Sequence, residues 1–160
     1  MTCWGKSAES AIEGDFKLRV GTKVPEITGS DCDGTLFSLD DYSGHVRVVI
    51  FTGNWCPPCK AMYPQLTDLQ TKDKGVTILG VSTDKELSTL KQAIENKEIT
   101  WRCWWGKGFG SILNGFGITR FPTVLVPDRS GTLRFKGLRD ESLVKAFELL
   151  CTETSDETPP

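Results

Sequence analysis

The chain has 160 residues, of which 38% are hydrophobic and 25% charged, a composition that excludes wholesale disorder and suits one domain. Its formal net charge of −2 excludes the strongly basic surface expected of a protein that binds nucleic acid or an anionic membrane. Residues 1–15 lack a continuous apolar stretch and predict a poorly ordered extension, neither signal peptide nor anchor. No window reaches the length of a membrane span, so no membrane insertion is expected. The acidic residues 152–160 predict a disordered tail, which leaves 16–151 as the domain.

The first elements in chain order are short strand candidates at 26–28 and 36–39, on either side of the turn sequence DCDG. Because Asp-Gly favours tight turns, this segment predicts an N-terminal β-hairpin. The β-branched run VRVVIF (46–51) predicts a buried strand. Residues 57–73 predict a helix with two prolines in its first turn and a kink at Pro64.

The second half of the chain continues the alternation of strand and helix. A buried strand is expected at 76–82 and an amphipathic helix at 84–97. Aromatic residues and glycines at 101–118 predict an irregular segment with a short helix near its end. Residues 122–137 predict a second hairpin, and 140–150 a closing helix.

This order of elements predicts an α/β fold. Strand–helix–strand alternation that ends in a hairpin and a helix favours a mixed sheet with helices on both faces. Parallel strands that are joined by helices are expected to cross over in the right-handed sense.

Cys56 and Cys59 are the one closely spaced pair among the six cysteines, and a CxxC pair suits three kinds of site. As half of a zinc site it needs two further ligands, but the chain has one histidine, His45, and no second close cysteine pair. As a structural disulfide it closes a very short loop and restricts the unfolded chain little. The surroundings of the pair favour the third kind, a redox centre.

The order strand–CxxC–helix predicts that Cys56 lies at the N-terminus of a helix. Unpaired amides and the helix dipole favour a thiolate there. Cys59, one turn later, is expected on the same helix face and deeper, where it can attack a mixed disulfide formed at Cys56. Pro57 and Pro58 stiffen the loop and remove backbone donors.

Three separated features resemble the thioredoxin superfamily: WCPPCK, Pro64 five residues after the second cysteine, and GITRFPTVLV far downstream. The N-terminal sequence VGTKVPEITGSDCDGTLFSLDDYSGHVRVVIF resembles the redoxin branch, which contains the TlpA/ResA-like disulfide reductases and the peroxiredoxins. The similarity covers roughly residues 20–150. It implies a thioredoxin-like fold, in which a mixed central β-sheet has helices on both faces and an N-terminal β-hairpin extension.

The resemblance also implies further site residues. Pro122 would be the cis-proline that faces the CxxC loop. Phe121 and Thr123 would border the site, where main-chain groups pair with an extended substrate strand. Trp55 is expected either to shield the nucleophile at the surface or simply to pack against its surroundings.

Two positions depart from related proteins. Thioredoxins carry a buried acid six residues before the first cysteine, where this chain has Ile50. TlpA/ResA-like reductases often carry Glu three residues after the second cysteine, where this chain has Met62. Asp84 could reach the same edge of the sheet, but its position favours a helix N-cap. Water or a backbone group is therefore expected to manage the proton of Cys59.

These residues predict a thiol–disulfide oxidoreductase acting as a reductase on a protein disulfide, with an upstream thiol as electron donor and no metal or other cofactor. A monomer is expected. One alternative is a thiol peroxidase, although Gly53 and Val49 stand where peroxiredoxins place Thr or Ser and Pro. Another is a non-enzymatic module that uses the CxxC to hold a metal or to respond to redox state. The resemblance implies an extracytoplasmic compartment, whereas four additional cysteines favour the cytoplasm.

Other notable residues are given structural roles. Trp101, Trp104 and Trp105 form either an apolar rim for a protein partner or part of the core, and core packing is favoured. The sequence GKGFGS at 106–111 has neither of the phosphate-binding spacings and predicts a flexible loop. The remaining cysteines are predicted to be small buried apolar groups or incidental thiols: Cys3, Cys32, Cys103 and Cys151.

Overall fold

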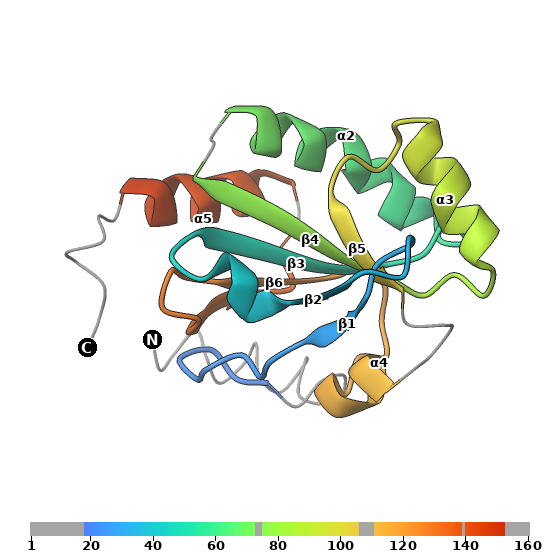
Figure 1. Cartoon of the computed structure of the whole chain (residues 1–160). Helices are drawn as coiled ribbons and strands as arrows, with labels where there is room; N and C mark the ends of the chain where they lie inside the picture. The colour runs from blue at the N-terminus through green and yellow to red at the C-terminus, as the bar shows by residue number, and fades with distance from the viewer. Residues whose placement is uncertain (1–17, 73–74, 106–110, 139, 153–160) are drawn as a thin grey trace.

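Five strands form the central sheet of the computed structural model, which describes residues 18–72, 75–105, 111–138 and 140–152. In chain order they are β3 (Val46–Thr52), β4 (Val76–Ser82), β5 (Arg102–Trp105), β6 (Thr123–Pro127) and β7 (Leu133–Lys136). Across the sheet the order is β5–β4–β3–β6–β7, which places β3 at the centre (Figure 1). The β3–β4 and β4–β5 pairs are parallel, whereas β6 runs antiparallel to both β3 and β7. The expected mixed sheet is confirmed.

Helices cover both faces of this sheet. Those of the described residues are α2 (Pro57–Lys72), α3 (Leu87–Glu95), α4 (Ser111–Phe116) and α5 (Asp140–Thr152). Helices α2, α3 and α5 lie on one face, and α4 lies on the other (Figure 1). Each helix forms where the sequence predicts one, although α3 is shorter at both ends than the predicted 84–97. Pro64 lies inside α2.

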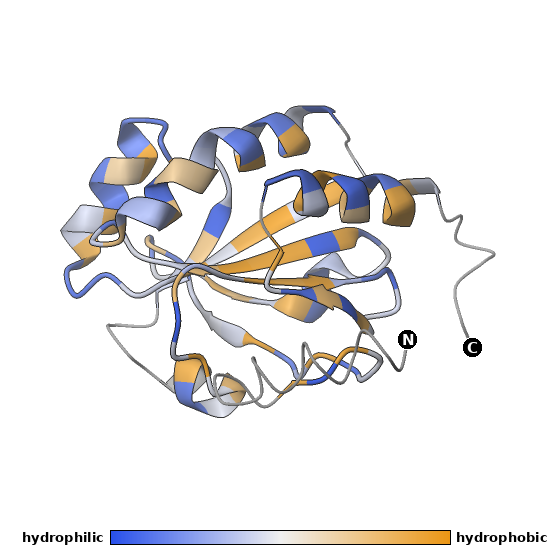
Figure 2. Ribbon diagram, turned by 180° about the vertical axis from the view of Figure 1, so that it is seen from behind, coloured by the Kyte–Doolittle hydropathy of each residue, from blue (hydrophilic) through white to orange (hydrophobic). Residues whose placement is uncertain are grey.

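The central strand β3 is buried along its whole length. Because side chains alternate along a strand, Val46, Val48 and Ile50 pack against α2, α3 and α5. Val49 and Phe51 join a second core on the opposite face. Figure 2 shows the resulting hydrophobic layer running along the strands between the helices. Burial on both faces explains the unbroken β-branched run in the sequence.

An N-terminal hairpin covers the second face together with α4. Its strands are β1 (Thr28–Ser30) and β2 (Leu36–Ser38), which pair antiparallel and lead into a 3₁₀ helix, η1 (Leu39–Tyr42). The carboxylate of Asp31 accepts hydrogen bonds from two backbone amides of the turn, and Gly34 adopts the positive φ that the turn requires (84°). The predicted hairpin is confirmed, although its first strand begins two residues later than the predicted 26–28.

The sequence predicts an irregular segment after α3, but Arg102–Trp105 forms β5, a strand at the edge of the sheet. Trp101 and Trp104 are buried, and the Trp104 ring stacks on Phe37 with centroids 4.4 Å apart. Trp105 is half-buried. The favoured prediction of core packing is therefore confirmed for Trp101 and Trp104. The alternative, an exposed aromatic rim, is wrong for these two residues.

Several sequence predictions fall outside the described residues. These are the N-terminal extension 1–15, the glycine-rich stretch 106–110 and Cys3. Of the predicted tail 152–160, only Thr152 is described, and it ends α5. Among the helices that the structure describes, none combines the length and the apolar character needed to cross a membrane.

Candidate active site

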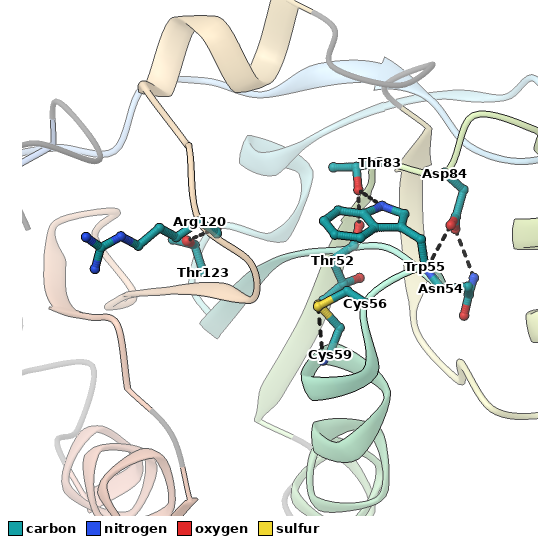
Figure 3. Close-up of a disulfide and its surroundings, with 9 residues drawn as sticks. All are labelled: Thr52, Asn54, Trp55, Cys56, Cys59, Thr83, Asp84, Arg120 and Thr123. Atoms are coloured by element: carbon teal, nitrogen blue, oxygen red, sulfur yellow. Dashed lines mark hydrogen bonds between the residues drawn. A yellow bond between two sulfur atoms is a disulfide. The ribbon is translucent and has the colours of Figure 1, made fainter.

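The CxxC pair lies where the central strand ends and helix α2 begins (Figure 3). Cys56 directly precedes the first helical residue, Pro57, and Cys59 lies in the first turn. The two cysteines form a disulfide, with Cα atoms 5.3 Å apart. The predicted place of Cys56 at the helix N-terminus is therefore confirmed.

The two prolines leave few backbone donors at the start of α2. Pro57 and Pro58 carry no N–H, so the first helical residue with an amide to donate is Cys59. That amide donates to the carbonyl of Cys56 over 3.1 Å and also to its Sγ over 3.4 Å. A sulfur that receives a hydrogen bond at the positive end of a helix is stabilised as a thiolate once the disulfide is reduced.

The second cysteine lies deeper than the first. Cys59 is fully buried and Cys56 is 4% exposed, whereas neighbouring Trp55 is 53% exposed. Ile50 and Met62, which stand where related proteins carry acids, are buried in the apolar core beneath the pair. Neither position therefore offers a carboxylate to accept the proton of Cys59.

The segment between Arg120 and Thr123 contacts the residue before Cys56, because the rings of Phe121 and Trp55 meet there (Figure 3). The Phe121–Pro122 peptide bond is cis, as the family resemblance implies. The ring of half-buried Phe121 meets Trp55 edge-on, with centroids 5.3 Å apart. Thr123 is buried, and its hydroxyl donates to the carbonyl of Arg120 over 2.6 Å. That bond uses the one proton of the hydroxyl, so the Thr123 side chain has no further hydrogen bond to donate.

Asp84 has a different role from the predicted helix N-cap. Helix α3 begins at Leu87, with Glu86 in the cap position, so the prediction for Asp84 is wrong. Asp84 is 3% exposed and accepts hydrogen bonds from the backbone amide of Asn54 (2.7 Å) and from its side-chain amide (2.9 Å). The hydroxyl of Ser82 donates to the same carboxylate over 2.9 Å. A helix cap and this network both need an acceptor after a strand, which is why the position alone could not separate them.

The neighbouring Thr83 also contacts the loop before Cys56. Its hydroxyl accepts a hydrogen bond from the indole Nε1 of Trp55 over 2.8 Å and donates to the carbonyl of Thr52 over 3.0 Å. Sequence reasoning missed both Thr83 and Asn54. The one available signal was that residues 83–84 directly follow β4, a parallel neighbour of β3, so they lie at the same edge of the sheet as the CxxC.

A cavity of about 580 Å³ opens beside Trp55. It lies between the loop before Cys56 and the start of α3. Its lining residues are Asn54, Trp55, Thr83, Asp84, Lys85, Glu86 and Thr89. Lys60, the residue after Cys59, does not line this cavity. Its ammonium forms an ion pair with Glu98 at 3.2 Å on the surface.

The other described cysteines, Cys32, Cys103 and Cys151, form no disulfide. Cys103 is buried in the core, and burial raises the pKa of its thiol. Cys32 is half-buried, and burial and the nearby acids Asp33 and Asp31 raise the pKa of its thiol. Cys151 is half-buried in α5. A raised pKa keeps Cys32 and Cys103 protonated near neutral pH, which makes them poor nucleophiles.

Metal-binding clusters were sought across the part of the chain that the structure describes. No group of three or more His, Cys, Asp and Glu side chains is close enough there to hold a metal ion. His45, the one histidine, is exposed at the start of β3 and shares a hydrogen bond with Thr77 over 3.2 Å.

Comparison with known proteins supports a redox interpretation of this site. The model of the AhpC/TSA family matches residues 20–136. The chain belongs to this family. Thiol-disulfide oxidoreductase ResA of Oceanobacillus iheyensis is 33% identical over 98 residues, which are 57% of this chain and 51% of ResA. The chain spans between 51% and 63% of the length of this ResA and of two further curated relatives.

Solved structures match a larger share of this chain than ResA of Oceanobacillus iheyensis does. The thioredoxin domain of a thiol-disulfide oxidoreductase from Bacteroides vulgatus is 34% identical, with a TM-score of 0.75, over 83% of this chain and 98% of that domain. A thiol:disulfide interchange protein from Bacteroides sp. is 31% identical, with a TM-score of 0.75, over 88% of this chain and 95% of that protein. This chain is therefore a TlpA/ResA-like member of the thioredoxin superfamily. It carries the domain found in thiol–disulfide oxidoreductases.

Proposed function

We propose that this chain reduces disulfides in protein substrates by thiol–disulfide exchange. The observation that carries the proposal is the position of Cys56 and Cys59. The first lies at the N-terminus of α2 beside the exposed Trp55, and the second is fully buried one turn later. Such a pair can present one sulfur to a substrate while it keeps the other for an internal attack.

In the first step the thiolate of Cys56 attacks one sulfur of the substrate disulfide. The bond between the two substrate sulfurs breaks, and the leaving sulfur departs as a thiolate that takes up a proton. The Cys59 amide, which donates toward Cys56 Sγ, stabilises the attacking thiolate. The product is a mixed disulfide between Cys56 and the substrate.

In the second step Cys59 loses its proton and attacks Cys56 Sγ, which releases the second substrate thiol. The substrate gains two electrons and two protons, and the Cys56–Cys59 pair becomes the disulfide seen in the structure. An external dithiol donor then reduces the pair for the next cycle. Because Ile50 and Met62 are buried apolar residues, water is proposed to accept the proton of Cys59.

The substrate is proposed to bind in an extended conformation across the Pro122 segment. Main-chain groups of Phe121 and Thr123 pair with it, and the exposed face of Trp55 covers the attacked sulfur. The chain acts as a monomer in this scheme, with a protein disulfide as substrate and a separate thiol protein as donor.

A peroxidase function fits the loop less well. Peroxiredoxin-like sites place Thr or Ser three residues before the reactive cysteine, and here the space beside Gly53 is filled by Trp55 and Thr83. A Cβ on Gly53 would lie 2.6 Å from Thr83 Oγ1, so a larger side chain has no room.

The test measures the reduction of a protein disulfide by the reduced chain, with Cys56→Ser and Cys59→Ser as comparisons. The proposal expects turnover by the wild type only. Equilibration with redox buffers then measures the reduction potential of the pair, which a reductase should hold near that of thioredoxin, about −270 mV. A potential near −120 mV would reverse the proposed direction. Rapid consumption of hydrogen peroxide without disulfide reduction would replace the proposal with the peroxidase.

A further inference from the structure

The turn that precedes the nucleophile belongs to no helix or strand. It spans Gly53 to Cys56, between the end of β3 and the start of α2. One hydrogen bond closes it, from the Cys56 amide to the Gly53 carbonyl over 3.1 Å. A four-residue turn with one internal bond has little intrinsic rigidity, so its conformation depends on the groups packed against it.

The second residue of the turn, Asn54, is held at two points by Asp84. One carboxylate oxygen accepts the backbone amide of Asn54 and the other accepts its side-chain amide. The hydroxyl of Ser82 and the Asp84 backbone amide hydrogen-bond within the same cluster. A buried carboxylate with several donors is strongly held, because each lost bond would leave a charge without a partner.

The third residue of the turn, Trp55, is held by Thr83. The Thr83 hydroxyl accepts the indole N–H, and both its hydroxyl and its amide donate to the carbonyl of Thr52 at the end of β3. The indole lies close over Gly53, where no Cβ interferes. Thr83 and Asp84, directly after β4, therefore hold Trp55 and Asn54, the two residues before Cys56, by hydrogen bonds (Figure 3).

We propose that Asp84 and Thr83 are positioning residues that hold the Asn54–Trp55 segment, and through it Cys56, in the geometry for attack on a substrate disulfide. This inference rests on the proposed function. Neither residue exchanges electrons or forms a covalent bond; both act through the turn. Small misplacements of a reacting group can slow a reaction greatly, so loosening the turn should reduce the rate of exchange.

A role through charge alone predicts the opposite sign. A negative charge on Asp84, which hydrogen-bonds Asn54 two residues before Cys56, disfavours a thiolate at Cys56, so its neutralisation would raise the fraction of thiolate and speed exchange at low pH. A positioning role predicts slower exchange even at high pH, where Cys56 is fully deprotonated. The limiting rate at high pH therefore separates the two roles.

The experiment compares wild type with Asp84→Asn by two rates, both measured on the reduced protein at high pH. Exchange with a peptide disulfide should fall about tenfold, because Asn cannot accept all three donors. Alkylation of Cys56 by iodoacetamide, which needs no fixed orientation, should change less than twofold. The matched control is Asp128→Asn, which removes another buried carboxylate that accepts bonds from its own loop at the far end of β6. It should leave both rates unchanged.

A second pair of variants covers the case in which Asp84→Asn does not fold. Thr83→Val removes the hydroxyl that binds Trp55 and should slow exchange several-fold, whereas Thr83→Ser keeps the hydroxyl and should restore the rate. Exchange at the wild-type rate in both Asp84→Asn and Thr83→Val would overturn the positioning role while leaving the proposed function intact. Absence of exchange in the wild type itself would instead refute the proposed function. A parallel rise in exchange and alkylation when the two rates are measured again at low pH, with both unchanged at high pH, would show that Asp84 acts by charge and would overturn the positioning role.

Discussion

Trp55 folds its indole back over Gly53, so that a Cβ on Gly53 would overlap the indole ring. The glycine is required by close packing, since its φ lies outside the positive range in which glycine is favoured. The contact links the reactive loop to the end of β4, because the same indole N–H donates to Thr83.

We predict that Gly53→Ala displaces Trp55 and lowers the rate of disulfide exchange on the order of tenfold, with a loss of stability of about 1–3 kcal/mol from overpacking. Stopped-flow exchange with a peptide disulfide and chemical denaturation measure the two effects. The control is Gly115→Ala in α4, where a Cβ would meet no atom within 4 Å. It should leave exchange unchanged and stabilise the protein slightly. Equal effects of the two substitutions would contradict the packing argument.

A second close approach joins Gly80 to Cys103 in the core. A Cβ on Gly80 would lie 2.7 Å from Cys103 Sγ and 2.9 Å from the indole nitrogen of Trp101. Gly80→Ala should therefore destabilise the fold by about 1–3 kcal/mol. Adding Cys103→Ala should recover part of the loss, because it removes one of the two clashes. Urea denaturation of the four proteins in this cycle gives the coupling energy, and simple additivity would contradict the contact.

The N-terminal hairpin depends on one aromatic side chain. Phe37 stacks on Trp104, and the guanidinium of Arg102 lies 4.0 Å from the centre of the Phe37 ring. Phe37→Ala should cost about 3–5 kcal/mol of stability. Its neighbour Leu36 is 71% exposed, so Leu36→Ala should change stability by less than about 0.5 kcal/mol. Thermal denaturation would count against this packing if the two variants lost equal stability.

A pH effect is expected from Asp128. Burial alone would raise the pKa of its carboxyl, but hydrogen bonds from Ser130, Thr132 and Arg134 outweigh burial and hold the pKa below its usual value. The stabilisation is therefore complete above the unfolded pKa near 4 and is lost as the pH falls through the lower folded pKa. The unfolding free energy of Asp128→Asn should fall less steeply than that of wild type below about pH 4. Parallel curves would show that this carboxylate is not responsible.

The two long parallel strands could be predicted because their surroundings leave a simple pattern. All residues of β3 are buried, as are all but one of β4, so each appears in the sequence as a short run of β-branched and aliphatic residues. Strand β5 left no such pattern. Cys103 and Trp104 point to opposite cores, but the surrounding tryptophans and glycines resemble an irregular segment.

The candidate site divides in the same way. Cys56, Pro57 and Cys59 lie next to one another in the chain, so their arrangement follows from the strand before them and the helix after them. The bond between Asn54 and Asp84 joins residues 30 positions apart. It forms because β3 and β4 run parallel and end together, a register that no local pattern reveals. Tertiary pairing of this kind decided between the helix cap predicted for Asp84 and its observed role.

The most direct test of the account is to trap the mixed disulfide. The Cys59→Ser variant is reduced, mixed with a protein that contains one accessible disulfide, quenched with acid and digested for mass spectrometry. The account predicts a stable adduct at Cys56, because the buried sulfur that would release it has been removed. The adduct should be absent from Cys56→Ser. Adducts at Cys32, Cys103 or Cys151, or no adduct at all, would contradict the assignment of Cys56 as the attacking thiol.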